Sequence, residues 1–257
     1  HKANIIVVTH GSDTDAFWGV VRNGVEAAKA DTGADVQYRN PPTGDLNEMA
    51  SLIEAAIAQK PDGIVVSIPA PDILGGPIKA AVAAGIPVIS MNSGAGVSKS
   101  LGAVMHVGQP EFLAGQKAGE RAAAEGATNA ICLNQESFNT ALVDRCEGYG
   151  TAVKTKMIDS TNDPAEIQTR TAAALQADPS VDAILAAGPH VCDAAAKAIA
   201  EVGASIHLAC FDLSPAVMDL INSGQAAFTI DQQQRLQGYM PIIVLHLYNT
   251  NAGMLPG

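Results

Sequence analysis

One loop near the start of the chain gathers the side chains best suited to chemistry. Within residues 9–15 it contains His10, Asp13 and Asp15. A histidine and carboxylates on one loop could exchange protons with a substrate. The loop has no nucleophile beside an obvious base, however, and Asp15 stands where the helix that follows would have its N-cap. A soluble enzyme acting on a small carbohydrate through Asp15 and His10 is therefore the weaker hypothesis.

Two adjacent aromatic residues, Phe17 and Trp18, follow this loop in a chain that is only 4% aromatic. The apolar residues that continue the helix recur at helical spacing, so one face of the helix is expected to pack into the core. Both aromatic rings cannot occupy that face. We expect Phe17 to lie in the core and Trp18, the only tryptophan, to form a platform for a ligand.

Motifs of other chemistries are missing from the sequence. No GxxxxGK[ST], GxSxG, HExxH or CxxC is present, and the glycines at 94 and 96 lack the third glycine of a dinucleotide fingerprint. The histidines are scattered and form no cluster with metal-ligand spacing. We therefore expect no cofactor, no metal and no catalysis.

Composition limits the partners. The chain has 257 residues, a net charge of −11 and a pI of about 4.8, with 47% hydrophobic residues. This acidity disfavours binding to nucleic acid or to an anionic membrane surface. No apolar run approaches the ~20 residues of a membrane span. No signal peptide is evident, so we expect a cytosolic chain or one that starts at its mature end, with His1 as a tag remnant and a C-terminal segment missing after Gly257.

Four cysteines allow three pairings, and all lie in the second half of the chain. Cys132 falls on an expected strand and Cys146 on the helix that should pack beside it. A Cys132–Cys146 disulfide is predicted if the compartment is oxidising. For Cys192 and Cys210, buried free thiols are as good an interpretation as a second bond.

The elements that position these residues alternate between strand and helix. β-branched runs separated by helical patterns predict parallel sheets with right-handed crossovers. The expected strands form two series, 5–8, 35–39, 63–68, 86–91 and 103–107, then 130–133, 157–159, 181–187, 206–211 and 227–230. Loops at the carboxyl ends of such strands are where open sheets bind ligands.

The two series resemble each other. Residues 60–66 match 180–186 with an offset of 120 (183 − 63), and residues 84–89 match 202–207 with an offset of 118 (203 − 85). The sequence therefore predicts two similar doubly wound α/β lobes with a ligand cleft between them. We place the N-terminal lobe at 1–106 plus 237–257 and the C-terminal lobe at 107–236.

Several motifs in this order resemble the ribose/galactose-type periplasmic sugar-binding proteins, the receptors of ABC importers. The motifs are Asp15–Trp18 with Arg22–Gly24, Pro61–Ile64, Ala84–Ile89, Arg145–Tyr149, Cys210–Asp212 and Thr229–Gln232. The resemblance implies two lobes, joined by three hinge strands, that close on one sugar. It also implies a periplasmic location, a membrane permease as partner and a monomer.

The resemblance also implies ligand-binding positions. In the first lobe these are Asp15, the aromatic pair Phe17 and Trp18, and Asn92 in place of an acidic residue, with Ser93 where an arginine often follows. His10 is a further candidate in the first loop. An aromatic ring stacks on the C–H face of a sugar, and planar polar groups exchange hydrogen bonds with its hydroxyls.

In the second lobe a family arginine falls at Val143, and Asn139 is our substitute for it. An expected asparagine becomes Gly188, with His190 close by. The remaining matches are Asp212 and Gln232. Each polar residue also has a structural interpretation, as a helix cap, a turn former or a solvated side chain.

With both arginines replaced by shorter neutral residues, the ligand is expected to be a neutral pentose, deoxy sugar, branched sugar or polyol. The loops show no basic cluster, which disfavours a phosphorylated or strongly acidic ligand. The leading hypothesis is a receptor that delivers this ligand to a permease. A sensor domain that signals to a membrane kinase or chemoreceptor is a second alternative to the enzyme.

Overall fold

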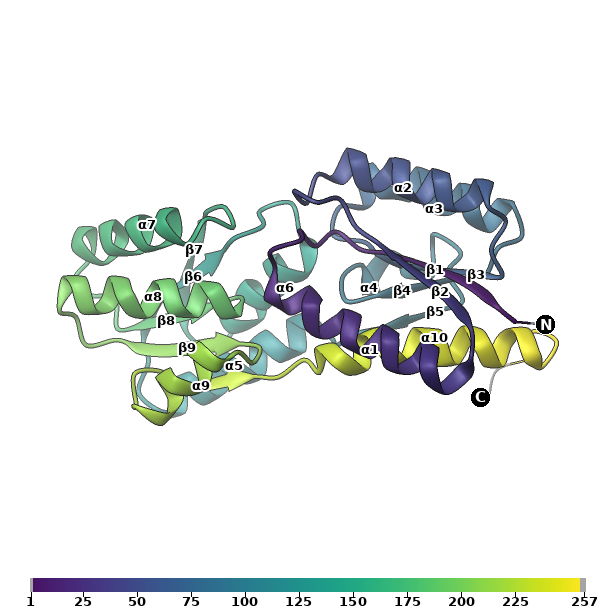
Figure 1. Ribbon diagram of the computed structural model, residues 1–257. Coiled ribbons are helices and arrows are strands. Elements are labelled where there is room, and N and C mark those ends of the chain that lie inside the picture. Colours follow the sequence, from purple (N-terminus) through teal and green to yellow (C-terminus); the bar gives the residue numbers. More distant parts are fainter. Residues whose placement is uncertain (1, 255–257) are drawn as a thin grey trace. The chain divides into compact units, whose positions relative to one another are not determined.

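The computed structural model describes residues 2–254 and divides them into two compact units. Unit 1 comprises residues 2–108 and 233–254, and unit 2 comprises residues 109–232. Each contains a five-stranded parallel sheet flanked by helices, which confirms the predicted fold class (Figure 1). The tag assigned to residue 1 and the chain end at 255–257 lie outside the described residues.

Unit 1 contains the first five strands, and the chain returns to it for the last helix. Its elements are β1 (Asn4–Val8), α1 (Ala16–Thr32), β2 (Asp35–Arg39), α2 (Leu46–Ala58), β3 (Gly63–Ser67), α3 (Pro71–Ala83), β4 (Val88–Met91), α4 (Ala95–Ser98), β5 (Met105–Val107) and α10 (Gln234–Thr250).

Unit 2 also alternates helices and strands, but it begins with a helix and ends with a strand. Its elements are α5 (Glu111–Ala124), β6 (Asn129–Asn134), α6 (Thr140–Tyr149), β7 (Lys154–Asp159), α7 (Pro164–Ala177), β8 (Ala183–Ala186), α8 (Pro189–Val202), β9 (His207–Phe211), α9 (Pro215–Asn222) and β10 (Phe228–Ile230).

The two sheets share one topology. The strand orders are β2-β1-β3-β4-β5 and, read from its other edge, β7-β6-β8-β9-β10. Both place the first strand of the unit between the second and the third, and all pairs are parallel. The direction of winding therefore changes between β1 and β3 and again between β6 and β8, which is where open sheets of this kind form their crevice.

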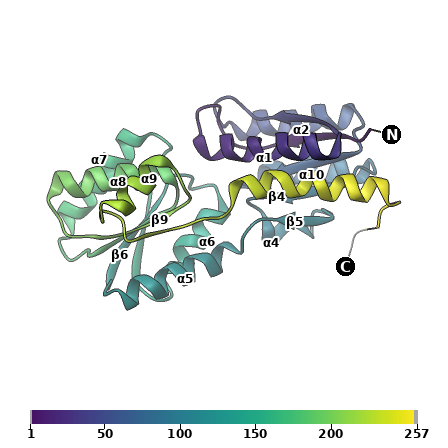
Figure 2. The same ribbon diagram turned by 60° about the horizontal axis from the view of Figure 1, so that its bottom comes forward.

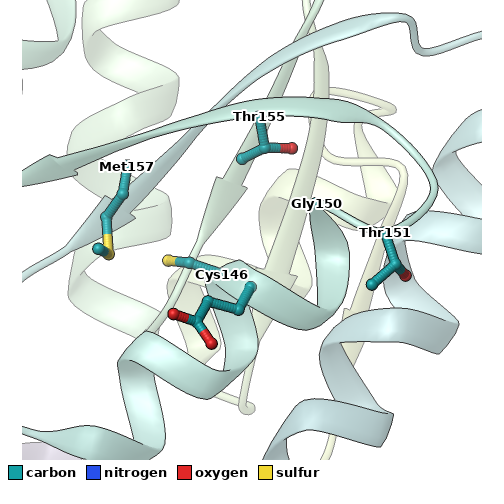
Figure 3. Close-up of a pocket in the computed structure, with 6 residues that line it drawn as sticks. Cys146, Gly150, Thr151, Thr155 and Met157 are labelled. Carbon is teal, nitrogen blue, oxygen red and sulfur yellow. The ribbon is translucent and has the colours of Figure 1, made fainter.

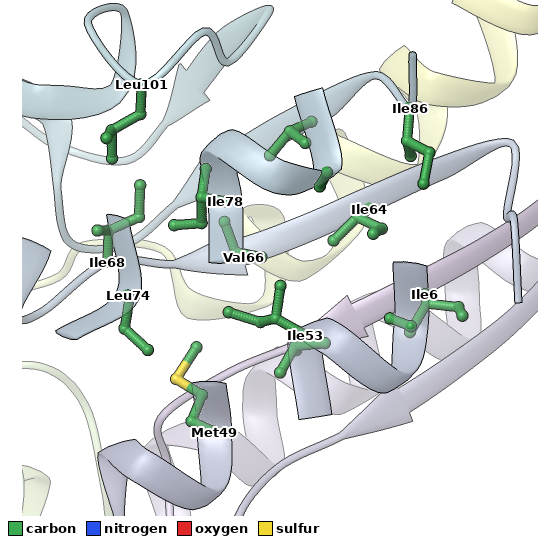
Figure 4. Close-up of a cluster of buried hydrophobic side chains, with 14 of the residues drawn as sticks. Ile6, Met49, Ile53, Ile64, Val66, Ile68, Leu74, Ile78, Ile86 and Leu101 are labelled. Carbon is green, nitrogen blue, oxygen red and sulfur yellow. The ribbon is translucent and has the colours of Figure 1, made fainter. Parts of the chain in front are cut away.

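Each sheet is covered on both faces, so its strands are apolar throughout. In β1, Ile6 and Val8 point to the layer of α2 and α3, where Met49 and Leu74 complete the cluster drawn in Figure 4. Ile5 and Val7 point to the opposite face, toward α1 and α10. This period of two explains why a run of four β-branched residues forms one short buried strand.

Two disulfides lie in unit 2, one on each face of the sheet, and each links a helix to a strand. Cys132 of β6 is bonded to Cys146 of α6, and Cys192 of α8 is bonded to Cys210 of β9, each with Cα atoms 5.6 Å apart. The sequence had left the second pair open. Because β6 and β9 lie on either side of β8, the two bonds tie helices to both sides of the sheet centre.

Glycines bring one helix pair of each unit into backbone contact. A Cβ atom on Gly24 of α1 would lie 1.9 Å from the Arg235 carbonyl oxygen, and one on Gly238 of α10 would lie 2.0 Å from that of Val21. Figure 2 shows α10 beside α1. In unit 2 the same device joins α5 to α6, since a Cβ on Gly115 would lie 2.1 Å from the Arg145 carbonyl oxygen.

The boundaries of the units cross the chain at two places within residues 2–254, after 108 and after 232. The three hinge strands implied by the resemblance are therefore not found in the described part of the chain. In that same part, none of the helices is both long and apolar enough to cross a membrane.

Candidate functional site

Most of the polar residues singled out in the sequence lie where the strands end or just beyond. In unit 1 they follow β1 and β4, and in unit 2 they follow β6, β8, β9 and β10. Parallel strands end at one edge of their sheet, so each unit collects its candidates at one edge. Each unit therefore has its own group of candidate residues, and the two groups are described separately.

His10 follows β1 and is buried within unit 1. Its backbone N–H donates to the Ser67 hydroxyl at 3.0 Å, and its Nδ1 lies 2.8 Å from the same oxygen. The imidazole packs edge-on against Trp18, with ring centroids 4.9 Å apart. These contacts join the ends of β1 and β3 and fix the orientation of the imidazole.

Asp15 is the N-cap of α1, as the sequence predicts, and its Oδ1 accepts a hydrogen bond from the Phe17 N–H at 2.9 Å. Phe17 and Trp18 are both buried in the cluster between the sheet and α1, and the exposed fraction of Trp18 is 3%. A Cβ on Gly11 would lie 2.0 Å from the indole, so the loop covers part of this ring. The expectation that only one of the two rings packs into the core is therefore wrong, because Trp18 lies in the same core cluster as Phe17.

Asn92 follows β4 in the left-handed backbone region, with φ of 62°. Asparagine tolerates this conformation better than most residues. Its N–H donates to the Val107 carbonyl at 2.9 Å, and its Nδ2 donates to Gln237 Oε1 at 3.3 Å. The next residue, Ser93, has a buried hydroxyl without a hydrogen-bond partner among the described residues.

Asp212 follows β9 and repeats the geometry of Asn92 in unit 2. Its φ is 72°, and its N–H donates to the Ile230 carbonyl at 2.7 Å. Gln232 donates from Nε2 to Asp212 Oδ2 at 2.9 Å, whereas the buried Oδ1 accepts no hydrogen bond from the described residues. A buried carboxylate oxygen in this state costs about 1–3 kcal/mol or more, which a ligand hydroxyl could offset.

Burial raises the pKa of the Asp212 carboxyl to about 7, an effect that Arg145 and the Gln232 amide partly oppose. The Glu111 carboxylate raises the pKa further. Asp212 can therefore exchange its proton near neutral pH.

Arg145 of α6 is a residue that the sequence analysis did not place in the site. Its side chain is buried, with Nε 2.6 Å from Glu111 Oε2 and Nη2 3.0 Å from Oε1. Nη1 donates to the Ala187 carbonyl at 2.8 Å, and the guanidinium lies 4.4 Å from the centroid of the Phe211 ring. Arg145 thus lies at the ends of β8 and β9, next to Asp212.

This arginine is an addition to the candidates named from the sequence. The resemblance places the family arginine at Val143 and leaves the second lobe with shorter neutral residues, whereas the structure has a buried arginine on α6, at position 145. Arg145 stands two residues further along the helix and was quoted only as part of a motif. The only sequence signal for its burial would have been a pairing with Glu111, which lies 34 residues earlier.

Gln135 is a second residue that the sequence analysis missed. It follows β6, is buried, and has an Oε1 without a hydrogen-bond partner among the described residues. Its Nε2 lies 2.9 Å from the position that a Cβ on Gly188 would occupy. An amide is therefore present beside position 188, although that residue itself has no side chain.

The last two candidates of unit 2 are held by neighbours. Asn139 is the N-cap of α6, accepts from the Ala141 N–H at 3.1 Å and donates to Glu136 Oε2 at 2.8 Å. His190, the second residue of α8, lies with Nε2 3.0 Å from Asn162 Oδ1. Both stand at the strand-end edge, Asn139 buried and His190 half-buried.

A separate surface pocket of about 260 Å³ lies between the end of α6 and β7 in unit 2 (Figure 3). Its lining residues are Cys146, Glu147, Gly150, Thr151, Thr155 and Met157. None of them is a predicted ligand-binding residue. In residues 2–254, no group of three or more His, Cys, Asp or Glu side chains is arranged to hold a metal ion.

Comparison with known proteins identifies a family. Residues 5–250 match the family described as periplasmic binding protein domain. The chain is similar to the xylose/arabinose-binding protein XylF of Sulfolobus acidocaldarius, with 26% identity over 95% of this chain and 65% of that protein. It thus spans less than two thirds of this relative's length, at 65%.

Solved structures agree with this match. A carbohydrate transporter from Acidothermus cellulolyticus, in complex with myo-inositol, is 37% identical, with a TM-score of 0.94 over 100% of this chain and 90% of that one. The periplasmic sugar-binding protein of an ABC sugar transporter from Legionella pneumophila is 25% identical, with a TM-score of 0.93 over 99% and 97%. The chain therefore belongs to the periplasmic binding protein family.

Proposed function

We propose that this protein is the solute-binding receptor of an ABC importer and binds one neutral sugar or polyol without changing it chemically. The observation that carries the proposal is the set of polar atoms at the strand ends of unit 2. Among the described residues, Asp212 Oδ1 and Gln135 Oε1 are buried acceptors without partners, and Arg145 has N–H donors beyond those bonded to Glu111 and Ala187. Alternating acceptors and donors of this kind suit the hydroxyls of a polyol.

Unit 1 contributes the complementary half in this proposal. Asn92 occupies the position that Asp212 occupies in unit 2, and Ser93 adds a buried hydroxyl without a partner among the described residues. One ligand contacting both half-sites would favour closure of the two units upon it. A membrane permease that recognises the closed form is the proposed partner.

The proposal assigns no catalysis to the first loop, because its candidate groups are engaged in structural contacts. His10 is bonded to Ser67, and Asp15 caps α1. The solved relative crystallised with myo-inositol makes an uncharged cyclic polyol the first ligand to test. Two disulfides support a location in an oxidising compartment such as the periplasm.

A thermal-shift screen tests the proposal, with myo-inositol, neutral pentoses, hexoses, deoxy sugars and linear polyols as probes. A bound ligand stabilises the folded state by about 2.7 kcal/mol at a hundredfold excess over Kd. We expect a clear rise of Tm for one or a few related compounds, each recovered unaltered. If a compound is consumed during incubation, the enzyme hypothesis replaces the receptor hypothesis. If no compound changes Tm, neutral sugars and polyols are excluded as ligands.

A further inference from the structure

Unit 2 contains a group of buried charged residues. Contact with a neutral ligand does not by itself explain why they are charged. Glu111 begins α5, Arg145 lies on α6, and Asp212 follows β9, and all three are buried. Arg145 interacts electrostatically with both carboxyl groups, and more strongly with Glu111. Burying charges is costly unless they are paired and hydrogen-bonded, so the way in which these charges are paired matters for the ligand.

Glu111 occupies most of the guanidinium. An arginine has five N–H donors, and Arg145 uses two on Glu111 and one on the Ala187 carbonyl. Two N–H donors, one on each terminal nitrogen, have no partner in the part of the chain that the structure describes. The side chain can therefore still donate hydrogen bonds, but its positive charge is balanced by the Glu111 carboxylate.

The position of Glu111 is fixed by packing. The close approach of α5 to α6 depends on Gly115 and Gly148, whose absent Cβ atoms would each lie 2.1 Å from a backbone oxygen of the other helix. Gln109 donates to Glu111 Oε2 at 2.9 Å, which adds a second donor to that oxygen. The carboxylate is thus held against the guanidinium.

We propose that Glu111 makes this half-site selective for uncharged ligands, by neutralising Arg145 in the presence of the Asp212 carboxyl. This inference rests on the proposed function, because it assumes that a ligand reaches Arg145. With Glu111 in place, the three groups have no net positive charge to offer a carboxylate or phosphate. Glu111 acts through Arg145 and is a positioning and charge-setting residue.

The test compares two probes of similar ring size, myo-inositol and D-glucuronate, by calorimetric titration of the full chain. Glu111→Gln keeps an oxygen that can accept from Arg145 and removes the negative charge. We expect the affinity for D-glucuronate, relative to myo-inositol, to rise by about tenfold or more, since unit charges a few ångströms apart interact strongly even at an effective dielectric constant of about 20. Glu111→Asp, which keeps the charge, should retain the wild-type ratio.

The matched control is Glu166→Gln, the same change in an exposed ion pair with Arg170 on α7; it should leave both affinities unchanged. If Glu111→Gln does not fold, Gln109→Lys replaces it. That half-exposed side chain can pair with Glu111 and adds one positive charge, so the ratio should shift in the same direction. A ratio within twofold of the wild-type value in the folded variants would overturn the inference.

The same titrations separate this inference from the proposed function. A wild-type chain that binds no neutral sugar or polyol overturns the receptor proposal. Glu111→Gln that gains D-glucuronate binding in that case still supports the role of Glu111 in charge selection. A folded Glu111→Gln or Gln109→Lys that responds to neither probe overturns the charge role.

Discussion

At the scale of single residues, the two positions after β4 and β9 combine a backbone requirement with a chemical one. Asn92 and Asp212 both have positive φ values, and both donate their N–H to the end of the adjacent edge strand. A glycine would satisfy the turn with less strain. Asparagine and aspartate satisfy it and also place a planar polar group at the strand ends, as the proposed ligand binding requires.

Asp212 should make stability depend on pH. Its carboxyl has a pKa of 3.8 in the unfolded reference and about 7 in the folded protein, because burial disfavours the charged form. Between these values the folded state holds the proton more tightly than the unfolded state, so the free energy of unfolding falls as pH rises from about 4 to about 7. Below this window the contribution is fully present, and above it the contribution is lost.

Urea unfolding of the wild type and of Asp212→Asn at a series of pH values checks this expectation. The unfolding free energy of the wild type minus that of the variant should decrease as pH rises through that window, because the carboxyl titrates there and the amide does not. The groups facing Asp212 are Arg145, Glu111 and Gln232, and they are unchanged in the variant. Parallel pH profiles for the two proteins would contradict the assignment.

Residue roles were predictable only where a local signal exists. Asp15 was recognised as a helix cap from its place before an apolar periodic run, and the structure confirms this. Arg145 gave no such signal, because its partner Glu111 lies 34 residues away and meets it only through the packing of two helices. Buried charge pairs of this kind are tertiary features, and a spacing rule within one element does not detect them.

At the scale of elements, the strands could be predicted because they are buried on both faces. A short continuous apolar run bounded by turns has few other interpretations in an alternating chain. The helix pairs that touch through glycines were not predicted. Gly24 and Gly115 resemble ordinary helix-interior glycines in the sequence, and only the positions of Arg235 and Arg145 show that each lies against another backbone.

Two glycines of α1 offer a sharp test of this packing. Gly24→Ala would place a methyl group 1.9 Å from the Arg235 carbonyl oxygen, so we expect a loss of about 1–3 kcal/mol in unfolding free energy. Gly19, in the same helix, has no atom within 4 Å of the corresponding position. Gly19→Ala should instead stabilise the protein by about 0.5–1 kcal/mol through helix propensity.

Chemical unfolding of the two variants decides between packing and propensity. Effects of opposite sign support close contact between α1 and α10. Equal stabilisation by both alanines would show that the helices do not approach each other as described. Because α1 is the first helix of unit 1 and α10 is its last, the result also shows how much the packing of α10 stabilises that unit.

At the scale of the whole molecule, the internal repeat was the most informative feature of the sequence. Offsets of about 120 residues between matching segments predicted two similar units, and both sheets have the same strand order. The number of chain crossings was not predictable from the repeat, since the repeat concerns the interior of each unit. Two crossings occur within residues 2–254 where the resemblance implied three.

The repeat leads to a prediction about how binding energy is shared. If each unit supplies a half-site to one ligand, Asn92→Ala in unit 1 and Gln135→Ala in unit 2 should both weaken binding of myo-inositol. Each change removes a polar partner, and an unpaired ligand hydroxyl costs about 1–3 kcal/mol, or about 5- to 150-fold in Kd. Asn23→Ala, on an exposed position of α1, is the control and should leave Kd unchanged.

Isothermal titration measures the three Kd values and the stoichiometry. Losses in both site variants, with one ligand per chain, mean that neither half-site is sufficient, and this requirement would couple ligand binding to closure of the units. A loss confined to Gln135→Ala would place the ligand in unit 2 alone. In that case the repeated geometry at Asn92 would serve only the turn after β4, and the two-unit receptor proposal would fail even though the fold is that of the family.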